Sequence, residues 1–499
     1  MKAGLIGLGV MGRNLALNLR DKGHEIIATD AWESAREWTA PGISIVNSHA
    51  ELATALGDNR VILLMVKAGE QVDKEIADLL PHLTAGDMII DGGNSLFTET
   101  ERRAADLASK GIGYLGCGIS GGAEGARHGA AIMAGGGETD WKRAKELLTS
   151  FAATAGADKQ PTVDYFGTGG AGHFVKMVHN GIEYAIMQAI AEAHALMRDC
   201  AGLSPDEISA HFAEWATDGD GAGFLLEITA GIVNAKDAIT GDLLLPLIDD
   251  VAGQKGTGGW TVKAALDQGV PATAIMEAVG ARQVSGERDA RQVMRRAAGK
   301  RKPFAVAPDL IEDLVADIES TLAAAMLVSV SQGLKIYAEA AREKGWSGEL
   351  PAVLRVWRAG SILRMRMLDG LANQLDAHPG TEDCLAVPAI ARELVGRLPA
   401  WRNVAITAIS AGVPAPVTTS ALAYIDALTT DQLPTAVVQA QRDRFGAHGF
   451  RRTDRGGDHH GPWAQPDDQE LSPQSDDQEL SAQPGASETS GQPDEETNS

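Results

Sequence analysis

Short apolar segments alternate with amphipathic stretches over the first third of the chain. The amphipathic stretches include residues 14–22 and 99–110. Apolar runs of this length, separated by helical periodicity, predict parallel strands joined by helices on both faces of one sheet. We therefore expect an α/β domain of the Rossmann type over residues 1–170. Its candidate strands are residues 2–8, 25–29, 61–66, 88–91, 113–117 and 131–134.

Helical periodicity replaces the strand signals over residues 171–435. Residues 172–200 contain no proline and one internal glycine, enough for a helix of about 45 Å at about 1.5 Å per residue. The segments QAIAEA and FAEW are echoed by QGLKIY and LRVW about 142 to 144 residues later. This internal repeat predicts a large all-α domain built from two similar halves. The basic segment 299–308, which contains two prolines, is expected to join them.

The last 36 residues, 464–499, differ in composition from the rest. They repeat DDQELS, contain ten acidic residues and no Lys or Arg, and are poor in large apolar side chains. Such a segment cannot bury enough apolar surface to offset its ordering entropy, so we expect a disordered acidic tail. The remainder carries about −13 of the net charge of −23, which argues against a nucleic-acid partner.

Composition and cysteine content indicate a cytoplasmic globular protein. No apolar run reaches the roughly 18 residues of a membrane span, because glycine, proline or charge interrupts each one. Cys117, Cys200 and Cys384 are far apart and odd in number, as expected in a reducing cytosol without disulfides. No CxxC pair or histidine-rich cluster indicates a zinc site. We expect no membrane partner and no metal.

A glycine motif follows the first candidate strand and precedes a helical pattern. Its residues are Gly7, Leu8, Gly9, Val10, Met11 and Gly12. In this setting the first glycine permits a tight turn, the second lets the backbone approach a pyrophosphate, and the third allows close helix packing. The helix N-terminus then favours the phosphate charge. A purely structural turn is the alternative, but the strand–turn–helix setting favours a bound dinucleotide.

Asp30 follows the second candidate strand, where the chain meets the adenosine ribose of such a dinucleotide. A carboxylate there accepts hydrogen bonds from the 2′-hydroxyl and repels a 2′-phosphate. The next residue, Ala31, offers no cation, whereas Arg36 could reach a 2′-phosphate. This corner of the sequence predicts a preference for NAD over NADP.

Two further loops each follow an apolar strand. One contains Val66, Lys67 and Ala68, and the other contains Asn94. In an open parallel sheet, ligands bind beyond the carboxyl ends of the strands, where both loops would lie. Asn94 could hydrogen-bond a substrate hydroxyl or the nicotinamide ribose. The alternative for Asn94 is a local Asx turn.

Four polar residues lie on one face of the helix expected after the dinucleotide domain. Residues three, four and seven apart share a helix face, which aligns Lys176, His179, Asn180 and Glu183. Such a face could simply be solvated. A partly desolvated lysine can instead act as a base, and a glutamate in a similar place can hold a proton to donate. The position just past the dinucleotide domain favours that chemistry.

Additional cations could bind an anionic substrate. Lys255 lies in a glycine-rich loop that lacks the spacing of a nucleotide P-loop. Arg282 and the late pair Arg442 and His448 add further positive or hydrogen-bonding groups. Each of these residues taken alone could be ordinary surface charge.

Seven motifs occur along the chain in the order GLGVMGRNLALN, VKAG, IDGGNS, SGGAEGAR, GHFVKMVHNGIEY, IDDVAGQKGTGGW and QAQRDRFGAH. In type and order they resemble those of the 6-phosphogluconate dehydrogenase (decarboxylating) family, long form. The resemblance covers residues 1–463 and excludes the acidic tail. It implies oxidative decarboxylation of 6-phospho-D-gluconate to D-ribulose 5-phosphate and CO2, with reduction of a nicotinamide cofactor, in the pentose phosphate pathway and gluconate utilization.

The resemblance also implies roles for individual residues. Lys176 would be the base in the oxidation and Glu183 the acid that completes the reaction, without a metal. Residues 436–463 would reach the partner subunit of a homodimer, so that Arg442 and His448 complete the partner's site. The residues that match substrate ligands of the family are Asn94, Ser120, Gly121, Gly122, His179, Asn180, Tyr184, Lys255, Arg282, Arg442 and His448.

The chain departs from the family pattern at several positions. Ala123, Ala134 and Gly280 are changes on the scale of packing. The change at Asp30 and Ala31 is different, because NADP-binding members usually place Asn-Arg-Thr at this corner. The cofactor expected from the residues is thus NAD, and the one expected from the usual family pattern is NADP.

Two other functions fit parts of the sequence. A β-hydroxyacid dehydrogenase acting on a small unphosphorylated acid would share the glycine motif and the helix lysine, but it would not need the cations around Lys255 and Arg442. A catalytically idle scaffold acting through its acidic tail would not need the pair Lys176 and Glu183. Both are weaker interpretations.

Overall fold

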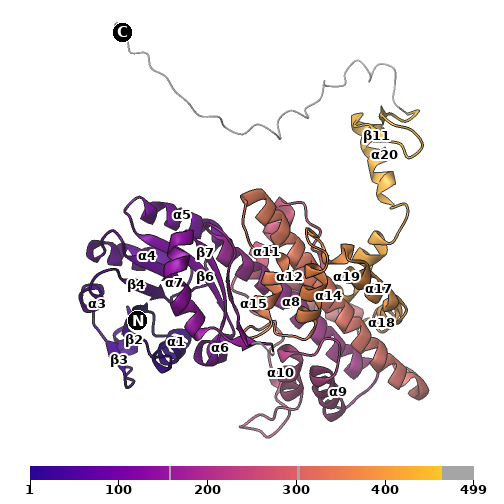
Figure 1. Cartoon of the computed structure of the whole chain (residues 1–499). Coiled ribbons are helices and arrows are strands. Elements are labelled where there is room, and N and C mark those ends of the chain that lie inside the picture. Colours follow the sequence, from indigo (N-terminus) through magenta and orange to yellow (C-terminus); the bar gives the residue numbers. More distant parts are fainter. Residues whose placement is uncertain (157–158, 300–303, 464–499) are drawn as a thin grey trace, which may run out of the picture. The chain divides into compact units, whose positions relative to one another are not determined.

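The computed structural model describes residues 1–156, 159–299 and 304–463, which form two compact units (Figure 1). The first unit is Met1–Ile425 and the second begins at Asp426. The expected disordered tail, 464–499, and residues 300–303 of the expected connecting segment lie outside the described residues. The domain boundaries at residues 170 and 435 stay predictions.

The N-terminal part of the first unit is built on an eight-stranded sheet with the order β10-β7-β6-β5-β4-β1-β2-β3. The glycine motif, Asp30 and both ligand-loop candidates follow β1, β2, β4 and β5, which are neighbours in this order. The carboxyl ends of these parallel strands therefore share one edge of the sheet. The strands are β1 (Lys2–Ile6), β2 (Glu25–Thr29), β3 (Ile43–Ile45), β4 (Val61–Leu64), β5 (Met88–Asp91), β6 (Gly113–Ser120), β7 (Ala131–Gly136) and β10 (Val163–Tyr165).

The prediction of a wholly parallel sheet is wrong for one pair. β7 runs antiparallel to β6, because the chain returns beside β6 after one short helix instead of crossing over the sheet. All six predicted strands are present, with some ends shifted. The edge strands β3 and β10 were missed because three residues are too short to show a periodicity. A further small ladder, β8 (Thr154–Ala155) with β9 (Gln160–Pro161), was also missed.

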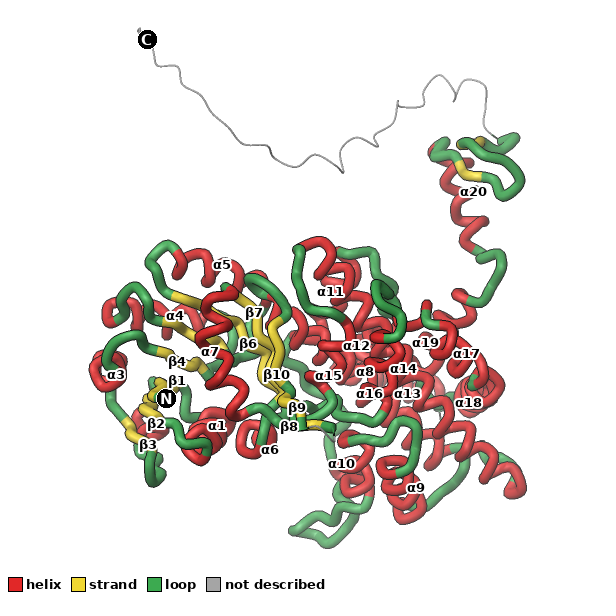
Figure 2. Tube along the Cα trace, in the orientation of Figure 1, coloured by secondary structure: helices red, strands yellow, loops and turns green. Residues whose placement is uncertain are grey.

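Helices cover both faces of the sheet, as expected for a Rossmann-type domain (Figure 2). One apolar layer includes Leu15 of α1 and Leu147 of α7, and the opposite layer includes Leu52 of α3 and Val72 of α4. The helices of this part are α1 (Val10–Asp21), α2 (Glu33–Arg36), α3 (His49–Leu56), α4 (Glu70–Leu79), α5 (Phe97–Ala108), α6 (Gly122–His128) and α7 (Glu138–Phe151).

The rest of the first unit is helical, and its two longest helices, α8 and α14, pack against each other. α8 also packs against β6 and β7, so its N-terminal half lies next to the sheet. The helix expected over residues 172–200 is confirmed by α8. The helices are α8 (Ala171–Asp199), α9 (Pro205–Thr217), α10 (Phe224–Val233), α11 (Thr257–Asp267), α12 (Thr273–Gly286), α13 (Arg288–Ala298), α14 (Ile311–Lys344), α15 (Leu350–Trp357), α16 (Met367–Asp376), α17 (Pro388–Gly396), α18 (Leu398–Ala411) and α19 (Pro416–Leu428).

The repeat found in the sequence corresponds to a repeat in element order, a long helix followed by a short one: α8–α9 and α14–α15. Each long helix also satisfies the first backbone N–H groups of a helix in the other half. Glu192 of α8 accepts hydrogen bonds from Val417 and Thr418 at the start of α19. Gln332 of α14 accepts one from Ala274 at the start of α12. These caps satisfy donors that lack intrahelical partners, and they link the two halves.

α14 is the one described helix that is long and apolar enough to cross a membrane by length and composition. However, 78% of its most apolar window is buried inside the protein. A central core helix passes the same test, so α14 is a core helix of this fold.

The second unit contains α20 (Thr435–Gly446) and a small hairpin of β11 (Phe450–Arg451) with β12 (Asp458–His459). Its buried centre is the carboxylate of Asp443, which is 2% exposed. This unit contains two of the expected substrate ligands, Arg442 and His448.

Candidate active site

The glycine motif forms a tight turn between β1 and α1. Gly7 has φ +103°, and a Cβ there would lie 2.5 Å from the carbonyl oxygen of Met65. A Cβ on Gly12 would lie 1.8 Å from the carbonyl oxygen of Gly7. A Cβ on Gly9, at the start of α1, would meet nothing within 4 Å. Two glycines are thus required by packing, whereas Gly9 leaves open space in front of a helix N-terminus, which fits a dinucleotide pyrophosphate.

The carboxylate of Asp30 is fixed beside this turn. The backbone N–H of Leu8 donates to Oδ2 at 2.6 Å, and that of Trp32 donates to Oδ1 at 2.8 Å. Arg36 donates from Nη1 to the backbone carbonyl of Asp30 at 2.8 Å. Its guanidinium is therefore engaged with the main chain, while its Nε is buried without a partner. The Asp30 carboxylate is thus held in place by two backbone N–H groups, and the nearby Arg36 guanidinium already donates a hydrogen bond to the main chain.

The loop after β5 is held by Asp91, which is fully buried. Its carboxylate accepts from the N–H of Gly93 at 3.0 Å, the hydroxyl of Ser95 at 2.6 Å and the hydroxyl of Tyr114 at 3.0 Å. Asp91 supplies the side-chain acceptor for this turn, and the side chain of Asn94 is exposed. This arrangement favours a ligand role for Asn94 over the Asx-turn alternative. Val66, Lys67 and Ala68 follow the neighbouring strand β4.

The four polar residues Lys176, His179, Asn180 and Glu183, here called the α8 polar face, are in contact with one another. Lys176 Nζ donates to Asn180 Oδ1 at 2.7 Å and lies 3.4 Å from His179 Nδ1. His179 Nδ1 lies 3.6 Å from Glu183 Oε2. Lys176 is 6% exposed, His179 0% and Asn180 9%. Glu183 is partly exposed, with 21% of its side chain accessible. Because the other three residues are buried, the alternative of a solvated helix face is wrong.

Residues from three other elements cover the α8 polar face. Ser120 Oγ, at the end of β6, lies 3.1 Å from His179 Nε2. Asn180 donates from Nδ2 to Thr257 Oγ1, at the start of α11, at 3.1 Å. The ring of Trp357 stands edge-on to that of His179, with centroids 5.6 Å apart. Thr257 and Trp357 were not predicted as site residues. Thr257 nevertheless belongs to the glycine-rich loop in which Lys255 was predicted.

Gly118 of β6 lets α8 come this close. A Cβ at Gly118 would lie 2.2 Å from Cβ of Lys176. Both atoms are attached directly to backbone, one on strand β6 and the other on the packed helix α8. A side chain at position 118 would therefore push Lys176 away. No periodic pattern or motif in the sequence marks this position.

Burial shifts the pKa values of the α8 polar face. Desolvation lowers the pKa of Lys176 to about 8, against the opposing effect of the Glu183 carboxylate. Desolvation raises the pKa of Glu183, partly offset by Lys176 and Arg282. Desolvation, together with the charge of Lys176, lowers the pKa of His179 well below its usual value. Burial thus favours the neutral amine of Lys176 and the protonated form of Glu183, which are the forms that a base and an acid need.

The cations expected around the substrate have different positions. The guanidinium of Arg282 lies 3.5 Å from the ring centroid of Tyr184 and donates to the carbonyl of Gly253 at 3.0 Å. Gly253 belongs to the same loop as the exposed Lys255, so Arg282 joins this loop to Tyr184. The charge of Arg282 also acts on Glu183. Gly121 and Gly122, both with positive φ, follow Ser120 at the start of α6. Arg442 and His448 are exposed side chains of the second unit.

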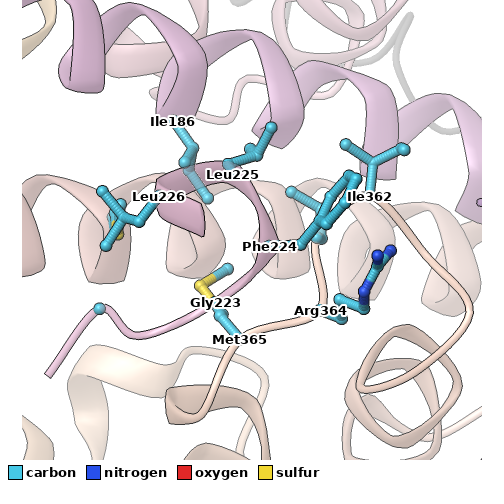
Figure 3. A pocket seen from close by; sticks show the side chains of 11 residues that line it. Ile186, Gly223, Phe224, Leu225, Leu226, Ile362, Arg364 and Met365 are labelled. Atoms are coloured by element: carbon cyan, nitrogen blue, oxygen red, sulfur yellow. The ribbon is translucent and has the colours of Figure 1, made fainter. Parts of the chain in front are cut away.

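A small pocket near the site is not the substrate site. Ile186, one turn beyond Glu183 on α8, lines it together with Phe224, Leu225 and Arg364, whose guanidinium lies over the Phe224 ring (Figure 3). Its volume of about 10 Å³ holds about one water molecule. The pocket is therefore a packing void next to the site.

Comparison with known proteins gives consistent matches over nearly the whole described chain. Residues 2–167 match the family model for the NAD binding domain of 6-phosphogluconate dehydrogenase, and residues 172–463 match the one for its C-terminal domain. A decarboxylating 6-phosphogluconate dehydrogenase of Haemophilus ducreyi is 41% identical over 459 residues, covering 91% of this chain and 94% of the relative. The human protein of that name is 41% identical over 456 residues, covering 89% and 93%.

A solved structure is similar at the level of the whole fold. It is the Plasmodium falciparum 6-phosphogluconate dehydrogenase, studied apo, with its cofactor NADP+ and with its substrate 6-phosphogluconate. The TM-score is 0.87 at 35% identity, and the match covers 93% of this chain and 100% of that chain.

Proposed function

The chain belongs to the 6-phosphogluconate dehydrogenase family, and we propose that it oxidises and decarboxylates 6-phospho-D-gluconate to D-ribulose 5-phosphate and CO2 while reducing a nicotinamide dinucleotide. This is a step of the pentose phosphate pathway and of gluconate utilization, and we place it in the cytoplasm. The observation that carries the proposal is the buried α8 polar face, in which a lysine of lowered pKa lies beside a glutamate of raised pKa. Absorbance at 340 nm with 6-phosphogluconate, and with gluconate lacking the phosphate, tests both the reaction and the alternative hydroxyacid substrate.

The dinucleotide would be held by Gly7, Leu8, Gly9, Val10, Met11 and Gly12, with Asp30 at the adenosine ribose and Val66, Lys67, Ala68 and Asn94 along the same edge. When bound, its nicotinamide accepts the hydride from C3 of the substrate. Neutral Lys176 takes the proton from the 3-hydroxyl in the same step. Lys176 is suited to this because burial already favours its neutral form.

Lys176 and Glu183 would then act in sequence on the substrate. Once protonated, Lys176 donates a hydrogen bond to the C3 ketone and stabilises the negative charge that develops as CO2 leaves. The proposal includes no metal, because the lysine supplies this positive charge. Glu183 then gives its proton to C1 of the enediolate that remains, whose oxygen becomes the C2 ketone of ribulose 5-phosphate, and burial of Glu183 favours the protonated form that this step needs. Ser120, His179 and Asn180 would orient the carboxylate end of the substrate.

We also propose a homodimer in which residues 436–463 reach the partner subunit. Exposed apolar side chains support an uncovered interface: Val293 and Met294 on α13 are 62% and 68% exposed, and Ile406 and Ile409 on α18 are 61% and 73% exposed. Val293 and Met294 are adjacent on α13, and Ile406 and Ile409 lie one turn apart on α18, so each pair exposes neighbouring apolar groups, as a surface that binds a protein partner does. Light scattering on the purified protein should give twice the mass of one chain.

The pH dependence of kcat/KM should follow Lys176. The neutral amine is the active base, and its fraction falls as pH drops below the pKa of about 8. We therefore expect kcat/KM to fall about tenfold per pH unit below about pH 8 and to level off above it. In Glu183→Gln the fall of kcat/KM should begin at a lower pH, because the Glu183 carboxylate raises the pKa of Lys176. A profile that is flat from pH 6 to 9 would contradict Lys176 as the base.

The enzyme should prefer NAD to NADP by at least about tenfold in kcat/KM. The fixed carboxylate of Asp30 would face the 2′-phosphate of NADP, and like charges at close range cost several kcal/mol, with about 1.4 kcal/mol per factor of ten. Asp30→Asn combined with Ala31→Arg should move the preference toward NADP, because an arginine pairs with the phosphate.

Glu33→Gln is the matched control, since Glu33 is an exposed acid on the adjacent α2. It should leave the preference unchanged. Faster turnover of NADP than of NAD by the wild-type enzyme, at equal low concentrations, would overturn this assignment of Asp30.

A further inference from the structure

The second unit contains a buried carboxylate between two exposed ligand candidates. Asp443 is 2% exposed, whereas its neighbour Arg442 and the nearby His448 are exposed. Each carboxylate oxygen of Asp443 has two hydrogen-bond partners. Oδ1 accepts from the N–H of Gly449 at 3.0 Å and lies 2.6 Å from His460 Nδ1, while Oδ2 accepts from the N–H of Gly461 and the indole N–H of Trp463, each at 2.8 Å.

These contacts keep Asp443 ionised. Partial burial raises its pKa, but the hydrogen bonds from Gly461, His460, Trp463 and Gly449 outweigh this and lower it to about 2. An ionised carboxylate only accepts hydrogen bonds, so His460 presents Nδ1–H to it. Four donors on one carboxylate fill its acceptor capacity, so this carboxylate ties Gly449, His460, Gly461 and Trp463 to α20.

The same contacts fix His448 relative to Arg442. α20 ends at Gly446, and Ala447 has φ +50°, a conformation that is unfavourable for alanine and must be held by its surroundings. The N–H of Ala447 donates to the carbonyl of Asp443, and the next residue after His448, Gly449, is bound on both sides. Its N–H donates to Asp443, and its carbonyl accepts from Gln439 Nε2 at 2.6 Å.

We infer that Asp443 is a positioning residue for the phosphate end of the substrate: it folds residues 447–463 back onto α20 so that Arg442 and His448 are presented together. This inference rests on the proposed function, because it takes these two residues as ligands of 6-phosphogluconate. Asp443 itself is covered by its four donors and does not contact the substrate. Its effect on the reaction passes through the placement of the two ligands.

Asp443→Asn tests this assignment. The amide nitrogen that replaces one oxygen meets two N–H donors instead of accepting from them, so the turn loosens at little change in volume. We expect the KM for 6-phosphogluconate to rise at least about tenfold, with kcat within about threefold and the KM for NAD unchanged. Asp454→Asn is the control, because Asp454 is an exposed acid of the same unit that pairs with the exposed Arg452 and Arg455.

Several results would overturn the inference. An unchanged KM for 6-phosphogluconate in Asp443→Asn would refute it, whether kcat stays the same or falls. If Asp443→Asn does not fold, Trp463→Phe decides, since it removes only the indole donor and should still raise the KM about two- to fivefold; an unchanged KM there refutes the positioning role. A wild-type enzyme without activity on 6-phosphogluconate would instead refute the proposed function.

Discussion

Lys176→Met should lower kcat by about 10² to 10⁴-fold, the usual contribution of a general acid–base group. Methionine is unbranched and only one atom shorter than lysine, and its apolar side chain suits a site that is 6% exposed, so the protein should remain folded. The loss should fall on kcat more than on the affinity for 6-phosphogluconate, because Lys176 acts on the reacting hydroxyl and ketone. Steady-state kinetics, with isothermal titration for substrate binding, measures both.

Two variants sharpen the interpretation of Lys176→Met. Lys263→Met is the control, because Lys263 is an exposed lysine on α11 that pairs with Asp267 and should tolerate the change. Glu183→Ala should also be slow, but mainly after hydride transfer, so the first turnover should still show rapid reduction of the dinucleotide. A Lys176→Met enzyme that retains more than about a third of the wild-type kcat would refute the assignment of the base.

Ending the chain after Gln441 should abolish measurable turnover of 6-phosphogluconate. This truncation removes Arg442 and His448, and hydrogen bonds to charged groups contribute roughly 1.5 to 3 kcal/mol each. Losing two such ligands corresponds to about 10² to 10⁴-fold in kcat/KM. Deleting only residues 464–499 is the matched control and should leave kcat/KM unchanged, because these residues lie beyond the family match that ends at residue 463. Equal activity of the two truncations would refute the ligand roles.

A mixed dimer separates a site completed by the partner from one completed within its own chain. Lys176→Met and the Gln441 truncation should each be inactive alone. When the two chains are coexpressed, a mixed dimer has one site with an intact Lys176 and with Arg442 and His448 supplied by the other chain. Recovered activity supports the exchange of the C-terminal segment between subunits. An inactive mixed dimer would show that each chain completes its own site.

Local sequence signals identified the parts of the site that depend on neighbours in the chain. The glycine turn was predictable because a side chain at Gly12 would meet the carbonyl of Gly7 only five residues earlier, and such a contact imposes a fixed spacing. The alignment of Lys176, His179, Asn180 and Glu183 follows from helix geometry alone. Asp30 was recognisable because it follows a strand directly. In each case the signal and its structural cause lie within one turn or one strand–helix unit.

The tertiary structure decided what those residues can do. The sequence left a solvated face as an alternative for α8, and it is the packing of β6, α11 and α15 around the helix that buries it. Gly118 and Thr257 make this possible from positions about 60 and 80 residues away from Lys176, without a periodic signal of their own. The direction of β7 was likewise set by the path of the chain, which the pattern of β6 and β7 does not reveal. The lowered pKa of Lys176 exists only in the folded protein, because desolvation is a property of the surroundings that segments distant in the sequence create together.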